Sequence, residues 1–157
     1  MAKRSKRKKR IRPLALCIFR RGERILVARG YDKSSGETFY RPIGGKIEFG
    51  EPASQTVARE VMEELGAEVT DIAYLGALEN IFVYEDKPGH EIVLIFDGRF
   101  VDESLNRDDA LFIGEDDNLL LYEASWQRLD AFRSEDMPPL YPTGLLDLID
   151  ASQPILQ

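Results

Sequence analysis

Three glutamates, Glu60, Glu63 and Glu64, stand close together in the stretch GGKIEFGEPASQTVAREVMEELGA, residues 44–67. Pro52 suits the first position of a helix and a glycine fourteen residues later suits its C-terminal cap, which predicts a helix of about fourteen residues. On such a helix the three carboxylates share one side and the apolar residues share the other. The stretch therefore predicts a helix with an apolar back and a carboxylate front.

This grouping of acids is unfavourable unless something compensates it. Glu60 and Glu64 are like charges four residues apart, and the negative end of the helix dipole opposes all three acids. No lysine stands between residues 52 and 67. A solvated acidic face is the plain alternative, but a bound cation explains the cluster better. Carboxylates without histidine or cysteine favour a hard ion, Mg²⁺ or Mn²⁺.

The same stretch resembles the signature of the Nudix hydrolases. Gly45, Glu51 and the run Arg59 to Ala67, REVMEELGA, match that signature at every fixed position. Apolar residues also stand where the signature requires them. Many fixed residues at fixed spacing make this a specific resemblance, and the order of the surrounding strands extends it over about residues 12–150.

The resemblance implies an α/β fold, the α/β/α sandwich with a mixed β-sheet. It also implies an Mg²⁺-dependent pyrophosphohydrolase that cleaves the diphosphate linkage of a nucleoside diphosphate derivative, with Mn²⁺ as the alternative ion. Carried over by position, one set of residues is implied to bind metal and an ion pair to orient it. The metal set is Glu60, Glu63 and Glu64 with the backbone of Gly44, and the catalytic set adds Arg59 and Glu51.

The substrate is less well defined than the reaction. Tyr84 stands where a tyrosine is typical of dinucleoside polyphosphate hydrolases. Phe82 and Val83 occupy the positions of the proline that is typical of ADP-ribose pyrophosphatases, and no motif for NADH-type substrates is visible. A dinucleoside polyphosphate, an ADP-ribose-like compound and a modified nucleoside triphosphate therefore stay open as the small-molecule substrate.

Three other groups are candidates for roles at the site. Glu115, with Asp116 and Asp117 behind it, is a candidate base or extra ligand, against the alternative of a solvated loop. His90, the only histidine, is a candidate for substrate binding or proton transfer, against a plain hairpin role. Four aromatic residues could stack on a base or pack in the core: Tyr31, Phe39, Tyr40 and Phe49.

Hydrophobic patterning predicts the elements around the helix. We expect a hairpin at 13–29, a polar loop at 29–42, and a second hairpin at 74–101 whose turn is Asp86 to Gly89. A long acidic loop is expected at 101–118, a last strand at 123–130 and a closing helix at 143–151.

At 157 residues the chain fits one domain, expected at 13–157, after a tail at 1–12 that carries eight lysines and arginines. Because the formal net charge is −7, the remainder carries −15. We expect this tail to be a solubilising or docked extension, or else to contact nucleic acid. An RNA 5′-end pyrophosphohydrolase that uses the tail is thus the second functional hypothesis, and a non-catalytic nucleotide-binding module is the third.

The compartment and assembly follow from simple features. Cys17 is the only cysteine, so it forms no internal disulfide, and a reducing cytoplasm is expected. No apolar run reaches the roughly 18 residues that span a bilayer, so no membrane partner is expected. The expected partner is a small nucleotide, and the sequence does not predict an oligomeric state.

Overall fold

The computed structural model describes residues 9–107, 109–115 and 121–152. Its strands and helices, in chain order, are β1 (Arg12–Arg21), β2 (Arg24–Asp32), β3 (Glu37–Arg41), β4 (Ile43–Lys46), α1 (Ala53–Leu65), β5 (Val69–Tyr84), β6 (Lys87–Phe100), β7 (Leu111–Glu115), β8 (Leu121–Arg128) and α2 (Leu145–Ala151). Short 3₁₀ turns lie at Glu103–Leu105 and Asp130–Arg133.

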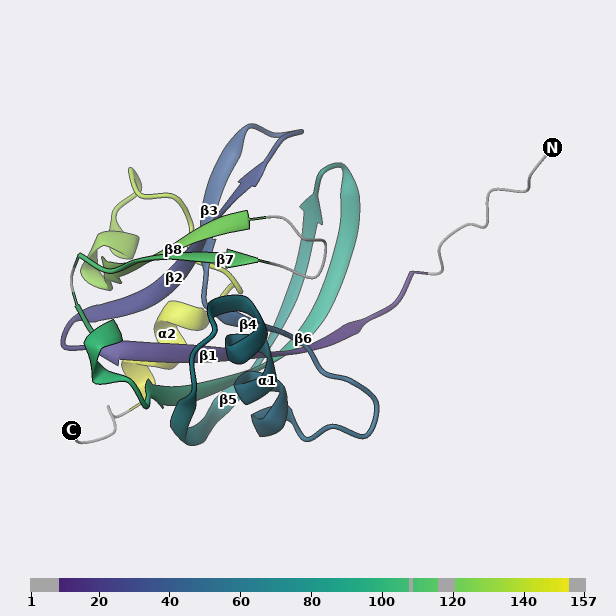
Figure 1. The fold of residues 1–157 in the computed structure, drawn as a ribbon. Coiled ribbons are helices and arrows are strands. Elements are labelled where there is room, and N and C mark those ends of the chain that lie inside the picture. The colour runs from purple at the N-terminus through teal and green to yellow at the C-terminus, as the bar shows by residue number, and fades with distance from the viewer. Residues whose placement is uncertain (1–8, 108, 116–120, 153–157) are drawn as a thin grey trace.

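The described strands form one mixed sheet, in the order β5-β6-β1-β2-β8-β7, with β3 beside β2 and β4 beside β1. β1 pairs in parallel with β6, from Arg12 opposite Glu91 to Phe19 opposite Gly98. The other pairings are antiparallel. β1 therefore lies at the centre, and β4 returns along it just before α1 begins (Figure 1).

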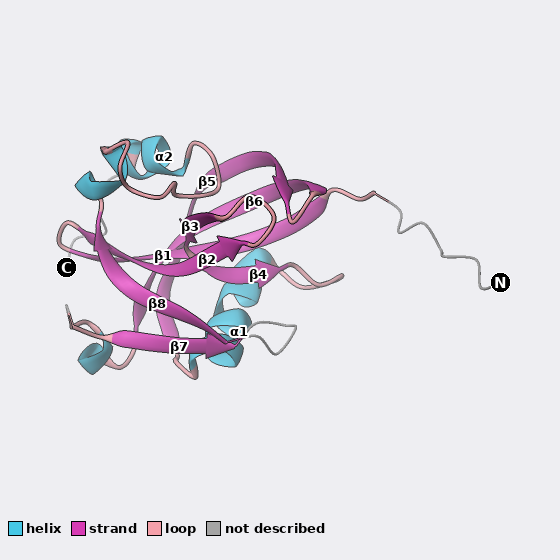
Figure 2. Cartoon of the chain, turned by 90° about the horizontal axis from the view of Figure 1, so that it is seen from above, coloured by secondary structure: helices cyan, strands magenta, loops and turns pink. Residues whose placement is uncertain are grey.

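The two helices cover opposite faces of this sheet (Figure 2). Because side chains alternate along a strand, a central strand that is buried on both faces is apolar at every position. β1 fits this rule from Leu14 to Phe19, since one set of these residues packs toward α1 and the other toward α2. The first set is Ala15, Cys17 and Phe19, with Val57 and Val61 of α1. The second is Leu14, Leu16 and Ile18, with Leu145 and Ile149 of α2. The α/β/α arrangement is confirmed.

The predicted polar loop at 29–42 is wrong. β2 continues to Asp32, and β3 pairs with it from Glu37 to Arg41. The tight turn between them is built by Asp32, whose Oδ1 accepts the backbone N–H of Ser34 at 2.8 Å, and by Gly36 at φ +76°. Polar turn residues dominate this stretch and hide two short strand segments, since a turn is recognised by its side chains more easily than a five-residue strand.

The predicted long loop at 101–118 also contains regular structure, namely the 3₁₀ turn at Glu103–Leu105 and strand β7 at Leu111–Glu115. β7 is an edge strand that pairs only with β8 among the described strands. Leu111 and Ile113 are exposed at 59% and 57%, while Phe112 packs against the core. An outward apolar residue breaks the alternation that identifies a strand in sequence.

Two boundaries differ from expectation. The turn of the second hairpin is Glu85-Asp86, with φ +48° and +60°, and Lys87 to Gly89 already belong to β6. Pro88 fits there because β6 pairs with β1 only from Glu91 onward. Pro52 is the N-cap of α1, with ψ 141°, instead of its first helical residue. No helix in the described ranges is long and apolar enough to cross a bilayer.

Candidate active site

Helix α1 carries the three glutamates, and its position is fixed by its buried apolar face and by its C-terminal cap. Val57 and Val61 are fully buried against the sheet. Gly66 adopts the left-handed conformation at φ +66°, and its N–H donates to the carbonyl of Met62 at 2.9 Å. This cap needs a residue without a Cβ penalty, as the glycine provides. The carboxylate front therefore faces away from the core and toward β4.

Arg59 organises that front. Its guanidinium donates to both oxygens of Glu51, with Nε–Oε2 at 2.7 Å and Nη2–Oε1 at 3.0 Å. It also donates to Glu60 Oε1 at 3.0 Å, to Glu63 Oε2 at 3.2 Å and to the carbonyl of Lys46 at 3.0 Å. One side chain thus ties α1 to the loop before it and to the end of β4. The expected Arg59–Glu51 ion pair is present.

Glu51 is held in its charged form by this contact. Two hydrogen bonds from Arg59 and one from the hydroxyl of Thr56 lower the pKa of Glu51 from 4.5 to about 2. The same partnership raises the pKa of Arg59. Hydrogen bonds to the ionised form of an acid favour that form, so the pair stays charged over the whole physiological pH range.

Two adjacent glycines bring β4 close to its neighbours. Gly44 has φ +151°, and a Cβ there would lie 2.1 Å from the carbonyl oxygen of Ala15 in β1. A Cβ on Gly45 would lie 2.4 to 2.7 Å from the carboxylate of Glu60. Glu60 is only 2% exposed. The backbone of β4 therefore lies directly on this carboxylate, as only glycine permits.

Glu64 has a partner outside the signature. The hydroxyl of Tyr122, on β8, donates to Glu64 Oε2 at 2.7 Å. The ring of Tyr122 lies over Gly114, its cross-strand partner on β7, where a Cβ would be 2.2 Å from the ring. Tyr122 is not predicted from the sequence, because nothing there indicates that β7, over whose Gly114 the ring lies, packs beside α1.

The donor chemistry of this front suits a hard divalent cation, since it consists of carboxylate oxygens and backbone carbonyls. Within the ranges that the structure describes, no three acidic, histidine or cysteine side chains are already gathered around one point. Glu60 and Glu63 turn toward Arg59, and Glu64 turns toward Tyr122. Metal binding would therefore require the more exposed Glu63 and Glu64 to rotate inward.

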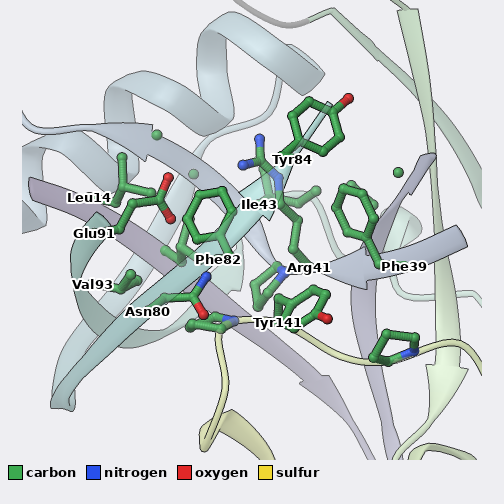
Figure 3. A pocket seen from close by; sticks show the side chains of 18 of the residues that line it. Leu14, Phe39, Arg41, Ile43, Asn80, Phe82, Tyr84, Glu91, Val93 and Tyr141 are labelled. Carbon is green, nitrogen blue, oxygen red and sulfur yellow. The ribbon is translucent and has the colours of Figure 1, made fainter. Parts of the chain in front are cut away.

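A pocket of about 430 Å³ opens beside this front. Gly44, Gly45 and Glu64 line one part of it, and residues of β1, β2, β3, β5, β6, β8 and the 139–142 segment line other parts (Figure 3). Its volume lies in the range of small-molecule sites. The pocket is the feature that joins the signature helix to residues far away in the sequence.

Aromatic rings shape the pocket through a repeated arrangement. Phe39 lies over Gly30, and Phe82 lies over Gly89, each glycine being the ring's direct cross-strand partner. A Cβ at either glycine would be 2.3 Å from the ring. The glycine lets the ring lie flat across the neighbouring strand, so a broad apolar face borders the pocket. Of the four aromatic residues that could stack on a base, Phe39 lines the pocket, whereas Tyr31, Tyr40 and Phe49 do not.

Arg41 and Tyr84 enter the same pocket. Tyr84 lies edge-on to Phe39 with ring centroids 5.9 Å apart, and its hydroxyl donates to the carbonyl of Tyr31 at 3.4 Å. Arg41 is half-buried beside them (Figure 3). Among the described residues its guanidinium has no hydrogen-bond or ion-pair partner. A half-buried cation without a protein partner is suited to an anionic ligand.

Two candidates from the sequence remain, His90 and the acidic residues at 115–117. His90 pairs with Ile81 on the opposite face of the β5–β6 hairpin, where its Nε2 lies 3.0 Å from Glu79 Oε2. His90 does not line the pocket, and its role in substrate binding or proton transfer stays a prediction. Glu115 is the last residue of β7, and Asp116 and Asp117 lie outside the described residues.

Comparison with known proteins decides the family. The NUDIX domain family matches residues 8–143. The chain belongs to the Nudix hydrolase family. This match covers far more than the signature helix, and it includes the strands that form the pocket.

Two bacterial NudC proteins are among the curated relatives of this Nudix chain. It is 32% identical over 137 residues to the NAD-capped RNA hydrolase NudC of Vibrio vulnificus, a match that covers 87% of this chain and 44% of that protein. It is 30% identical to NudC of Pseudomonas aeruginosa, over 83% of this chain and 39% of that protein. The chain thus spans less than half the length of these relatives.

Solved structures support the fold. A NUDIX hydrolase from Nitrosomonas europaea superposes with a TM-score of 0.62 at 16% identity, over 90% of this chain and 87% of that one. The solution structure of the E. coli ORF135 protein gives a TM-score of 0.58 at 21% identity, over 91% of both chains. At these identities the likeness concerns the fold alone.

Proposed function

We propose that this Nudix protein is an Mg²⁺-dependent pyrophosphohydrolase that cleaves the diphosphate linkage of a nucleoside diphosphate derivative. The observation that carries the proposal is the continuity of one pocket. Glu64 and the glycines of β4 line one part of it, and Arg41, which has no partner among the described residues, lines another part with the rings of Phe39 and Phe82. A nucleoside diphosphate derivative needs neighbouring surfaces of different kinds: an apolar one for its base, a polar one for its sugar and a cationic one for its diphosphate.

Glu60, Glu63 and Glu64, with the carbonyl of Gly44, would hold the cation. Members of this family generally use divalent metal ions, which stabilise the charge that develops on phosphate oxygens during attack by water. The protein's own residues supply orientation. Arg59 holds Glu60 and Glu63 from one side, and Tyr122 holds Glu64 from the other. Arg41 would bind a phosphate oxygen of the substrate and place the linkage near Glu64.

The experiment is product analysis by chromatography with Mg²⁺ and a panel of Ap4A, ADP-ribose, NADH, a GDP-sugar and 8-oxo-dGTP. We expect paired products from one class of substrate, lost in EDTA and reduced at least a hundredfold in Glu64→Gln. Glu68→Gln, an exposed acid just beyond the helix, is the matched control and should behave as wild type. Turnover in Glu64→Gln equal to that of the control would refute the proposed role of this glutamate.

Glu64→Gln also tests the cost of the acidic cluster. Glutamine keeps an oxygen that can accept from Tyr122, and the substitution removes one charge beside Glu60. In EDTA the variant should melt at or slightly above the wild-type temperature. A clearly lower melting temperature would mean that the negative charge of Glu64 stabilises the fold.

A second candidate function is hydrolysis at the 5′ end of RNA. Two observations favour it: the relatives are named NAD-capped RNA hydrolases, and the basic N-terminal segment leads into the pocket wall at Arg12. Arg12 begins β1 and forms an ion pair with Glu91. Lysines and arginines that precede it would meet the phosphates of an RNA whose 5′ end lies in the pocket.

Removing residues 1 to 11, while retaining Arg12, separates the two candidates. If RNA is the substrate, the deletion should reduce kcat/KM for NAD-capped or triphosphorylated RNA at least tenfold and weaken its salt dependence. Turnover of small nucleotides should stay as in the full chain. Unchanged RNA turnover after the deletion would exclude a role for the tail in RNA hydrolysis.

A further inference from the structure

Two polar side chains stand in the apolar wall of the pocket. Asn80 on β5 and Glu91 on β6 are direct cross-strand partners, and each is only 6% exposed. Both line the pocket beside the ring of Phe82 (Figure 3). Buried polar groups normally find their partners inside the protein, so a pair that presents unused hydrogen-bonding groups to a cavity indicates a ligand.

The orientation of the Asn80 amide is fixed by its neighbour. The backbone N–H of Thr143 donates to Asn80 Oδ1 at 3.4 Å, and the Thr143 hydroxyl lies 3.5 Å from the same oxygen. A backbone N–H can only donate, so the amide oxygen must face it and the amide nitrogen must face away. In the close-up this nitrogen points toward Phe82 (Figure 3). It has no acceptor among the described residues.

Glu91 provides the complementary group. Arg12 Nη2 donates to Glu91 Oε1, which fixes the carboxylate in the pocket wall. The second carboxylate oxygen has no donor among the residues that the structure describes. Because direct cross-strand neighbours have Cβ atoms about 5 Å apart, a donor on Asn80 and an acceptor on Glu91 lie side by side. One planar ligand edge can contact both.

Phe82 supplies a flat surface next to this pair. Its ring lies over Gly89, so one face is covered by the neighbouring strand and the other borders the pocket. Nucleobases stack on such rings with about 1–3 kcal/mol per base. A stacked base would turn one of its edges toward Asn80 and Glu91.

We propose that this compartment, Asn80, Phe82 and Glu91, selects a guanine base. The proposal rests on the proposed function, because it assigns the base of the nucleoside diphosphate whose linkage would lie near Glu64. Guanine carries an acceptor, O6, next to two donors, N1–H and the 2-amino group. Asn80 would donate to O6, and Glu91 would accept from N1–H and the 2-amino group.

Other bases fit this pattern less well. Adenine has an acceptor at N1 and no donor at C2, so it would turn a lone pair toward the carboxylate of Glu91. Hypoxanthine keeps O6 and N1–H but lacks the 2-amino group. A site built to hydrogen-bond a group rejects analogues that lack it, because its own buried groups are then left unpaired. The expected order of binding is GMP, then IMP, then AMP.

The test is calorimetric binding of GMP, IMP and AMP to the full chain in EDTA, where base selection is measured without metal or hydrolysis. We expect GMP to bind roughly tenfold tighter than IMP and more than tenfold tighter than AMP. Glu91→Gln should reduce the preference for GMP over IMP. Asn80→Leu, in which leucine has a volume similar to that of asparagine, should weaken the binding of GMP and IMP about tenfold and leave the binding of AMP unchanged. Glu79→Gln, on the other face of the same hairpin, is the control and should change nothing.

Several outcomes would overturn the proposal. These are equal binding of the three nucleotides, tighter binding of AMP, no GMP binding at millimolar concentration, or an equal loss for all three in both variants. Thermal melts of each variant identify a folding defect as the cause of such an equal loss. If the base preference holds but no diphosphate substrate is cleaved with Mg²⁺, the base assignment stands and the proposed function falls.

Discussion

Replacing Arg59 with glutamine should destabilise the protein strongly, because this guanidinium joins three segments. It donates five hydrogen bonds, to three carboxylates and to the carbonyl of Lys46. Glu63 is 52% exposed and contributes little to the total. Glu60, at 2% exposure, would lose its arginine partner while buried. The loss of this partner should therefore dominate the cost.

The size of the stability loss in Arg59→Gln follows from the burial of Glu60. Removing one partner of a buried ion pair costs roughly 3–5 kcal/mol. The Arg59 side chain is itself 27% exposed, so water compensates part of the loss and about 3 kcal/mol is expected. With a urea m-value of about 2 kcal/mol/M, the unfolding midpoint should fall by roughly 1.5 M. For a domain with a total stability of 5–15 kcal/mol, that loss is large.

Urea unfolding in EDTA, followed by Trp126 fluorescence and by circular dichroism, measures this loss. Arg133→Gln is the matched control, because Arg133 pairs with Asp150 at the surface, where the two side chains are 50% and 44% exposed. That variant should lose less than about 1 kcal/mol. Arg59→Lys should fall between them, since a lysine cannot form the two-pronged contact with Glu51. If Arg59→Gln lost no more unfolding free energy than Arg133→Gln, the hydrogen bonds of Arg59 would not stabilise the fold.

Two further predictions concern the neighbours of Arg59. Because the pKa of Glu51 is lowered from 4.5 to about 2 by Arg59 and Thr56, the unfolded state binds more protons between those values. The melting-temperature advantage of the wild type over Glu51→Gln should thus be full above about pH 4.5 and disappear as the pH falls toward 2; an advantage that grows on acidification would contradict the sign. Gly45→Ala should push aside the end of the Glu60 side chain, which should cost about 1 kcal/mol of stability but at least tenfold in turnover. Gly44→Ala would place its Cβ against the backbone of β1 and should cost roughly 3 kcal/mol or more. Paired urea melts and initial rates compare the two, and equal stability losses would refute the distinction.

The sequence by itself determined the helix of the signature, and the resemblance of that signature to the Nudix hydrolases implied the Arg59–Glu51 pair and the class of fold. The helix and the signature depend on residues close together in the chain. Helical periodicity sets which side chains share a face, and Gly66 ends the helix by its own backbone freedom. The apolar run of β1 and the order of the elements likewise follow from local patterns. For that reason the expected hairpins at 13–29 and 74–101 correspond to real strand pairs.

Local reasoning failed where short strands and turns overlap. β3 and β7 have five residues each, and their polar neighbours make them similar to loops. Their strand conformation comes from pairing with β2 and β8, which supply the missing hydrogen bonds. Strand propensity is a weak guide in such cases, because pairing and burial decide the outcome.

Only the tertiary structure decided which residues meet in the pocket. Tyr122 reaches Glu64 because β7 packs beside α1 and the Tyr122 ring lies over Gly114 of β7, and Asn80 faces Glu91 because of the register of the β5–β6 ladder. His90, one residue away from Glu91, turns to the other face for the same reason. A strand reverses its side chains at every residue, so a position is inside or outside the site according to the pairing register. That register is set by contacts between distant segments, which a single sequence does not display.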